Sequence, residues 1–177
     1  ISNLPWMEEM NKRYRTLTPE QAYVKIRHFC AFQERTHQEV KMKLHSYGIG
    51  WTEIGEIASK LIEEGFLNEE RFAMAYVGGK FRIKQWGRKK IELELKKKQV
   101  SGHNIRIALR DAIDMAEYEK TMLKVIEKKW SSIKPETDSL FTKKAKTQAY
   151  LFQRGFEQDL IVKLINKFQD ELNSQSV

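Results

Sequence analysis

The sequence contains one cysteine, three prolines and no long apolar run. Because Cys30 has no second thiol to pair with, an internal disulfide is excluded, and a cysteine-based zinc site is disfavoured on the same ground. No apolar run approaches the roughly 20 residues that cross a bilayer, and the amino end lacks the basic stretch and apolar block of a secretion signal. We therefore expect a cytoplasmic protein of one or two small domains, with no membrane partner.

The residue patterns that catalysis requires are also missing. The four histidines are scattered, and His37 and His45 lie eight residues apart on one predicted helix, too far for the i, i+4 pair of a zinc site. No glycine-rich loop ends in Gly-Lys-Ser or Gly-Lys-Thr, the signature of a phosphate-binding loop. The sequence therefore predicts a protein that is not an enzyme and needs no metal or other cofactor.

Charge is abundant but uneven. The 177 residues hold 32 Lys and Arg against 24 Asp and Glu, a formal net charge of +8. The stretch 80–98 has nine basic residues against two acidic ones, so the rest of the chain is nearly neutral. The nine are Lys80, Arg82, Lys84, Arg88, Lys89, Lys90, Lys96, Lys97 and Lys98. Basic charge concentrated in one place indicates a local binding site for an anionic partner such as nucleic acid.

Capping signals divide the chain into helices. The segments beginning at Thr18 and Thr36 are capping boxes, in which the Thr hydroxyl accepts from a free amide and a Gln or Glu three residues on reaches back. Thr52 is expected to cap the third helix and Asn68 the fourth, in which Gly78-Gly79 would cause fraying or a bend. Further helices are predicted over 87–98, 103–115, 116–130, 139–153 and 157–173. Because no strand pattern of alternating apolar residues occurs, the predicted fold class is all-α.

A repeat appears when the predicted helices are superposed. Each copy has a helix that closes with the same six-residue pattern: Leu, any three residues, Gly or Gln, and an apolar residue. Another helix starts a few residues later. The copies lie at 44–49, 95–100 and 151–156, at offsets of 51 and 56 residues. We therefore predict three tandem three-helix repeats that share apolar surface in an elongated, curved array. The predicted divisions are an amino-terminal arm (1–18) and repeats over 19–67, 68–115 and 116–177.

Two segments carry a more specific pattern. The first is LIEEGFLNEERFA (61–73), followed by Tyr76 and Val77, and the second is WGRKKIELELKKK (86–98). Together they resemble the most characteristic part of the RecX family, regulators of bacterial homologous recombination. The resemblance covers about residues 19 to 173 in order and is strongest between 44 and 113.

The resemblance implies a fold and a function. Members of the RecX family are all-helical, with three tandem three-helix repeats, and they bind the RecA recombinase filament on DNA. They are not enzymes: they resemble a long clamp in the filament's helical groove and limit filament growth, ATP turnover and strand exchange. The implied partners are the RecA filament and single- or double-stranded DNA, in recombination and DNA repair. Nothing in the sequence indicates an obligate oligomer, so we expect a monomer.

The helix predicted over 87–98 has an apolar face with Ile91 and Leu95 and a basic face opposite it. The basic face carries Lys89, Lys90, Lys96 and Lys97. With the flanking basic residues of 80–98, these lysines are expected to contact phosphates or an acidic strip of the partner. Because lysine is a point charge, little sequence preference is expected. The alternative is a solvated helix face that only keeps the protein soluble.

Other residues allow two interpretations each. A sparser basic set on the third repeat can extend the contact surface or be solvated; it comprises Lys143, Lys144, Lys146 and Arg154. Trp86 can stack on a base, or it can pack as a hydrophobic staple before its helix. Arg71 can equally pair with its acidic neighbours Glu69 and Glu70. The amino-terminal arm is expected to be a docking helix or disordered.

A second function stays open at this point. In a plain DNA-binding protein without a recombinase partner, each three-helix unit would act as a helix-turn-helix module that reads the major groove. Its recognition helix would need Arg, Asn or Gln near its start. Only the third helix of the second repeat, with His103, Asn104 and Arg106, fits that requirement. A purely structural adaptor is a third possibility, in which the lysines would be dispensable.

Overall fold

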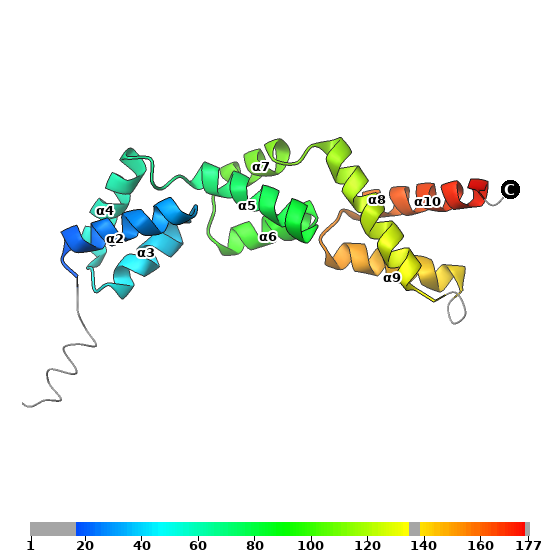
Figure 1. The fold of residues 1–177 in the computed structure, drawn as a ribbon, viewed down its shortest axis with the longest axis horizontal. Helices are drawn as coiled ribbons and strands as arrows, with labels where there is room; N and C mark the ends of the chain where they lie inside the picture. The colour runs from blue at the N-terminus through cyan, green and yellow to red at the C-terminus, as the bar shows by residue number, and fades with distance from the viewer. Residues whose placement is uncertain (1–16, 135–138, 176–177) are drawn as a thin grey trace, which may run out of the picture. The chain divides into compact units, whose positions relative to one another are not determined.

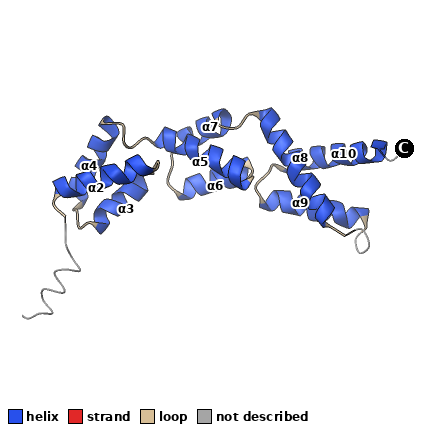
Figure 2. Ribbon diagram, viewed as in Figure 1, coloured by secondary structure: helices blue, strands red, loops and turns tan. Residues whose placement is uncertain are grey.

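The computed structural model describes residues 17–134 and 139–175, and within these ranges the chain forms nine helices and no strand (Figures 1 and 2). The predicted all-α class is therefore confirmed. The amino-terminal arm lies almost entirely outside the described residues. In chain order the helices are α2 (Pro19–Phe32), α3 (His37–Ser46), α4 (Trp51–Glu63), α5 (Glu69–Lys84), α6 (Arg88–Lys97), α7 (Gly102–Asp111), α8 (Met115–Ser132), α9 (Leu140–Gln153) and α10 (Gln158–Gln175).

Most of the predicted helix starts are confirmed. Thr18 and Thr36 form complete capping boxes, and the Asn68 side chain accepts from the amide of Arg71 at 2.8 Å. The predicted cap at Thr52 is wrong, because α4 begins at Trp51, two residues before the start that a cap at Thr52 implies. Its N-cap is Gly50, whose amide donates to the Glu53 carboxylate at 3.0 Å, so a side chain inside the helix supplies the cap.

Helix α5 runs without interruption through Gly78-Gly79, where fraying or a bend was expected. The reason is tertiary packing. Val77 and Phe81 on either side of the glycine pair are fully buried, and Gly78 is buried with them. Burial of two such side chains stabilises this turn by more than the cost of about 1 kcal/mol that each glycine brings to a helix.

The predicted repeat has a direct structural counterpart in the turn that ends its second helix. In each copy, the apolar residue after the turn donates its amide to the carbonyl of the Leu five residues earlier. These bonds are Ile49 to Leu44, Val100 to Leu95 and Phe156 to Leu151, at 3.2–3.4 Å. All six side chains are buried. The same backbone motif and the same core positions therefore recur three times.

The turn requires a left-handed residue, which the first and third copies supply as Gly48 and Gly155, with φ of 82° and 86°. The second copy has Gln99 at φ 59°. A side chain in this conformation costs about 1 kcal/mol, and glycine removes that cost. Gln99→Gly is therefore expected to raise the free energy of unfolding by about 0.5–1 kcal/mol in urea denaturation. An unchanged or lower value would show that the Gln99 side chain contributes contacts that outweigh its backbone strain.

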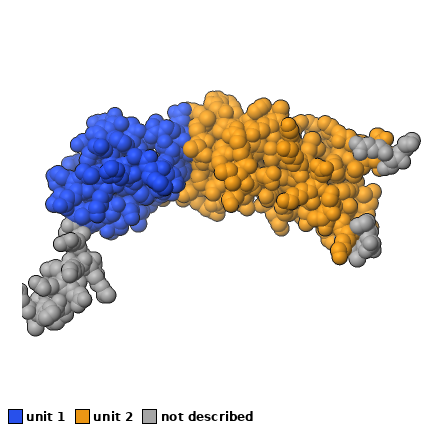
Figure 3. Space-filling model, in the orientation of Figure 1, with its two compact units in different colours: residues 1–72 blue, residues 73–177 orange. Residues whose placement is uncertain are grey.

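The helices gather into two compact units, residues 1–72 and 73–177 (Figure 3). In the first unit, α3 packs on α2 and α4 around one apolar core. The core residues are Ala22, Ile26, Cys30, Val40, Leu44, Ile49, Ile54, Ile57, Leu61 and Leu67. On α2, Ala22, Ile26 and Cys30 recur every four residues, and on α4, Ile54, Ile57 and Leu61 recur every three or four, so each of these helices buries one apolar face.

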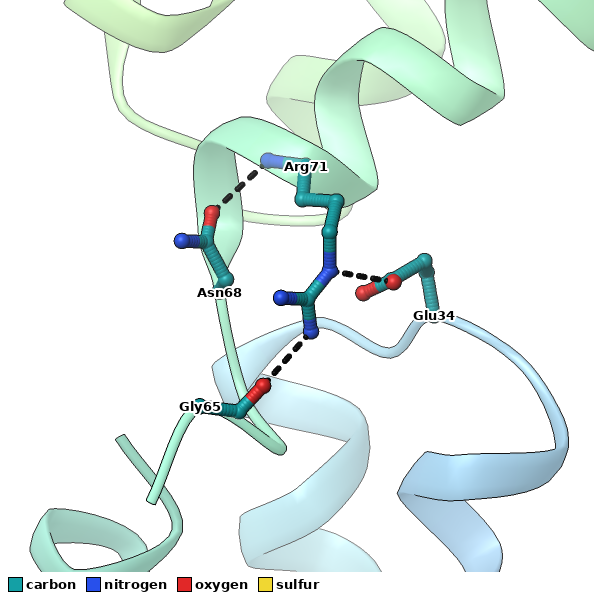
Figure 4. A network of polar contacts seen from close by, with 4 residues as sticks. All are labelled: Glu34, Gly65, Asn68 and Arg71. Atoms are coloured by element: carbon teal, nitrogen blue, oxygen red, sulfur yellow. Dashed lines mark hydrogen bonds and ion pairs between the residues drawn. The ribbon is translucent and has the colours of Figure 1, made fainter. Parts of the chain in front are cut away.

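In the first unit, polar contacts of Arg71 hold the α2–α3 loop and the α4–α5 loop together. The Arg71 guanidinium donates to the Glu34 carboxylate in the α2–α3 loop and to the carbonyl of Gly65, at 2.8 Å for the second bond (Figure 4). Glu34 is 37 residues from Arg71 in the sequence, whereas Glu69 and Glu70 are its neighbours. Sequence spacing therefore does not identify Glu34 as the partner of Arg71. The contacts join the α2–α3 loop to the start of α5.

Cys30 lies in the core of the first unit, and its burial raises the pKa of the thiol from 9.0 to about 11. A thiol protonated at pH 8 reacts poorly, because the thiolate is the nucleophile. Alkylation by iodoacetamide at pH 8 is therefore expected to be about 100-fold slower in the folded chain than in urea. Equal rates in the two states would mean that Cys30 is exposed.

In the second unit, α8 packs on α9 and α10, and α6 packs on α7. A backbone contact joins the second and third repeats. The amides of Gly87 and Lys89, at the start of α6, donate to the carbonyls of Arg154 and Gly155, after the end of α9, at 2.8 and 3.1 Å. Helix ends leave amides and carbonyls without partners inside the helix, and here two helix ends satisfy each other.

Tyr118 completes this junction between the two repeats. Its fully buried hydroxyl accepts from the Arg88 amide at 3.0 Å and donates to the Glu157 carboxylate at 2.6 Å. Its ring contacts those of Phe81 and Phe156, with centroids 5.6 and 5.4 Å away. Burial, together with the bond to Glu157, raises the pKa of the Tyr118 hydroxyl, which stays protonated and able to donate.

Candidate nucleic-acid interface

Lysines and aromatic rings alternate on the surface formed by α5, the following turn and α6 with its C-cap. In this row each Lys Nζ lies 4.6–5.8 Å from a ring centroid, within the range of a cation–π contact. The order is Lys98, Tyr76, Lys80, Trp86 and Lys90. We call these five residues the second-repeat ladder. It lies entirely within the second unit and combines cations with π-faces, the two elements of single-strand recognition.

The turn between α5 and α6 sets the position of Trp86. Gln85 is left-handed at φ 51°, and the Trp86 amide donates to the Lys80 carbonyl at 3.2 Å. This turn directs the Trp86 ring to Lys80, while Lys90 reaches it from the first turn of α6. Trp86 is half-buried, so part of its ring packs against the protein and part stays accessible to a partner.

The other lysines of α6 have glutamate neighbours. Lys96 pairs with Glu92 at 2.6 Å, and Lys97 pairs with Glu94 at 2.8 Å. The bond from Lys97 lowers the pKa of the Glu94 carboxyl, and the charges of Lys90 and Lys80 lower it further. Exposed pairs of this kind contribute about 0–1 kcal/mol, so a phosphate can displace the glutamates from Lys96 and Lys97. Lys89 is exposed on the same helix.

The two arginines of 80–98 make contacts within the protein that hold the fold together. Arg82 donates twice to the Glu117 carboxylate at 3.0 Å and once to the carbonyl of Ala112 at 3.1 Å. Arg88 lies over the Tyr118 ring, 4.3 Å from its centroid. Both side chains thereby connect the second repeat to α8 and the loop before it. The Lys84 side chain is exposed, and its carbonyl accepts from Arg154 at 3.1 Å.

The basic set predicted on the third repeat is divided between different contacts. Lys143 lies 5.1 Å from the Trp130 ring, and Lys144 donates to the Asn166 side chain at 2.7 Å. Arg154 belongs to the junction with the second repeat. Lys146 is exposed. These four residues do not form one row of the kind found on α5 and α6.

The sequence pattern identified the lysines of the ladder but not Tyr76, and it left Trp86 between two interpretations. A signal was present: Tyr76 and Lys80 are four residues apart on one helix, as Trp86 and Lys90 are across the start of the next. The pairing of Tyr76 with Lys98 joins two helices and depends on the tertiary fold.

Two further classes of site find no support in the part of the chain that the structure describes. There, no cluster of three or more His, Cys, Asp or Glu side chains is arranged to hold a metal ion. Also within these residues, none of the helices combines the length and the apolar character that spanning a membrane requires.

The fold and this surface define an all-helical protein of tandem three-helix repeats with a lysine-rich second repeat. Models of the second and third three-helix domains of RecX match residues 68–109 and 117–165. The chain belongs to the RecX family.

Relatives named Regulatory protein RecX agree with this assignment. The protein of Bacillus cytotoxicus is 28% identical over 171 residues, which cover 97% of this chain and 59% of the relative. That of Bacillus mycoides is 26% identical over 175 residues, which cover 99% of this chain and 60% of the relative. The chain thus spans about three fifths of the length of the curated relatives it matches.

Solved structures of RecX proteins share the fold. RecX from Lactobacillus salivarius superposes with a TM-score of 0.77 at 28% identity, over 85% of this chain and 96% of that protein. A second structure, of a regulatory protein RecX, has a TM-score of 0.75 at 17% identity, over 93% of this chain and 79% of the other, and indicates similarity of fold alone.

Proposed function

We propose that this protein regulates homologous recombination and DNA repair by binding the RecA nucleoprotein filament and restraining its ATP hydrolysis and strand exchange. The single observation that carries the proposal is membership of the RecX family. In this role the protein acts by binding, without a catalytic step or a cofactor. It works in the cytoplasm as a monomer divided into repeats over 19–67, 68–115 and 116–177, after an arm over 1–18.

The second repeat supplies the main contact in this proposal. Its lysines attract DNA phosphates or an acidic strip of the recombinase, and the rings of Tyr76 and Trp86 hold Lys80 and Lys90 in place. Four basic residues of the third repeat extend the surface: Lys143, Lys144, Lys146 and Arg154. Because the cations are lysines, binding follows the backbone and has little sequence preference.

The competing candidate is a helix-turn-helix-like DNA-binding protein without a recombinase partner. The observation that favours it is the start of α7, where His103 and Arg106 are exposed and Asn104 is half-exposed. Such a protein would discriminate between duplex sequences through base-edge hydrogen bonds, which a phosphate-binding surface would not do.

A pull-down of the purified chain with three separate targets distinguishes these candidates. The targets are recombinase alone, DNA alone and the filament assembled from both. The proposed function predicts the strongest retention with the filament. Retention by duplex DNA alone, with preference for one sequence and no gain from recombinase, would replace it by the helix-turn-helix candidate. Retention by free recombinase alone would support an adaptor.

A further inference from the structure

The first repeat carries a row of the same kind as the second-repeat ladder. Two rings and three cations alternate along α2, the α2–α3 loop and α3. The order is Lys25, Tyr47, Lys43, Phe29 and Arg35, which we call the first-repeat ladder. Its lysine-to-ring distances are 5.4–5.9 Å, and the Arg35 guanidinium carbon lies 3.8 Å from the Phe29 ring centroid. All five residues lie within the first unit.

The two ladders occupy equivalent positions with their chemistry exchanged. At the 51-residue offset of the repeat, four positions of the first ladder match four of the second. The matches are Lys25 with Tyr76, Phe29 with Lys80, Arg35 with Trp86, and Tyr47 with Lys98. Each ring in one repeat therefore stands where the other repeat has a cation. The alternation is retained although the residue at each position differs, so the alternating surface is the common feature.

A row of cations and rings can bind an anion only if carboxylates of the protein do not neutralise its cations. A cation–π contact holds a cation without neutralising it, whereas a salt bridge cancels its charge. Lys25, Arg35 and Lys43 form no ion pair with a carboxylate among residues 17–134 and 139–175. Lys25 is exposed, while Lys43 and Arg35 are partly exposed, and the Arg35 Nε also donates to the carbonyl of Phe29 at 3.4 Å. None of the three charges is cancelled by a carboxylate of the described residues, so each can still attract an anion.

Net charge conceals this surface in the sequence. Residues 19–67 contain six basic and seven acidic residues, and the repeat therefore looks neutral. Four of the seven acidic residues lie on α4 or directly after its end: Glu53, Glu56, Glu63 and Glu64. The ladder lies elsewhere, on α2, α3 and the loop between them.

We propose that the first-repeat ladder is a second binding surface for single-stranded nucleic acid. Its three cations hold successive phosphates, and the rings of Phe29 and Tyr47 contact bases through their exposed parts. A single strand fits better than a duplex, because only unpaired bases offer their faces to aromatic side chains. This surface is additional to the one on the second repeat, and it can be tested without recombinase.

The test measures binding of a fluorescent oligothymidylate to the full chain by anisotropy at several salt concentrations. In the variant K25Q/K43Q, two phosphate contacts are lost. The slope of log affinity against log salt should then fall by about 1.4, which corresponds to about 25-fold weaker binding at 0.1 M salt. The variant K25R/K43R retains charge and cation–π capacity, and it should bind like the wild type.

The variant K41Q/K60Q is the matched control. It removes two charges from the same repeat, and Lys60 lies 4.2 Å from the Tyr23 ring, so one cation–π contact is lost as well. Lys41 precedes Lys43 by two residues on α3 and therefore faces another side of the helix. The control should keep the wild-type salt slope. Thermal melting of each variant by circular dichroism verifies that it is folded.

Three results would overturn the proposal: a wild-type salt slope for K25Q/K43Q, an equal loss of slope in K41Q/K60Q, or equal affinity of the wild type for the oligothymidylate and a duplex of its length. The variant K80Q/K90Q, which changes the second-repeat ladder, distinguishes failure of the first-repeat proposal from failure of the proposed function. If K80Q/K90Q loses affinity while K25Q/K43Q does not, the first-repeat surface is rejected and the second-repeat surface is retained.

Discussion

Gly87→Ala is expected to lower the melting temperature by about 6–12 °C. A Cβ at this position would lie 2.2 Å from the carbonyl carbon and oxygen of Gly155 and 2.3 Å from the amide nitrogen of Phe156. Because these are backbone atoms, the start of α6 must move away. The hydrogen bonds from Gly87 and Lys89 to the third repeat are then weakened or lost. A loss of about 3 kcal/mol follows from the overpacking and the two bonds together.

Gly79→Ala is the control for this substitution. Gly79 lies inside α5 in the same unit, and apart from its chain neighbours and the adjacent backbone of its own helix nothing lies within 4 Å of the Cβ that alanine would add. Alanine at an open helical position should be neutral or stabilise by up to about 1 kcal/mol. Circular dichroism melting of both variants measures the difference. If Gly87→Ala melts together with the wild type, the two repeats are not in contact through this backbone junction.

Replacing Lys89, Lys90, Lys96 and Lys97 together by glutamate is expected to weaken binding to DNA-bound recombinase at least about 100-fold at 0.1 M salt. Four lost phosphate contacts remove about 2.8 from the salt exponent for a single strand, and the four new negative charges add repulsion. Melting should change by only a few degrees, because the ion pairs of Lys96 and Lys97 are exposed and contribute little. Fluorescence anisotropy of labelled filaments checks the affinity, and circular dichroism checks the fold.

The matched control reverses the same number of charges on the third repeat. It replaces Lys120, Lys124, Lys128 and Lys167, all of which are exposed in the same unit. This variant should lose much less affinity than the α6 variant. If both variants lose affinity equally, the net charge of the protein governs binding, and the α6 face has no special part in it.

Sequence pattern predicts helices well here because local rules and tertiary packing agree. The Thr18 and Thr36 capping boxes and the left-handed glycines at 48, 65 and 155 are local signals, and the helix boundaries follow from them within a few residues. The main disagreement at the end of a helix is α7, which stops at Asp111 although the apolar pattern extends to Ile113. Ile113 lies in the loop after α7, where its side chain is buried. Its place in the apolar pattern therefore indicates burial and does not show that the helix continues.

The candidate site is harder to predict, because its residues meet only in the folded chain. Charge counting identifies the lysines of 80–98 but gives no reason to separate them from Arg82 and Arg88, whose partners Glu117 and Tyr118 lie on α8. The close approach of Gly87 to Gly155 joins residues far apart in sequence. In the sequence, Gly87 only marks the start of a predicted helix and Gly155 the end of another, and neither position signals this contact.

The expectation of a curved, elongated array stays a prediction. The fold supports part of the reasoning behind it, since the second and third repeats share the buried side chains of Phe81, Tyr118 and Phe156. Repeats that share a core in this way depend on their neighbours for stability, as in other repeat proteins.

The central claim is that this chain restrains the recombinase filament through the lysine-bearing face of α6. The most direct measurement adds increasing amounts of the chain to RecA filaments preassembled on single-stranded DNA and follows the rate of ATP hydrolysis. The wild type and the third-repeat control should lower the rate with similar potency, while the α6 glutamate variant should leave it near the uninhibited value. Equal inhibition by all three proteins at moderate salt would contradict the claim.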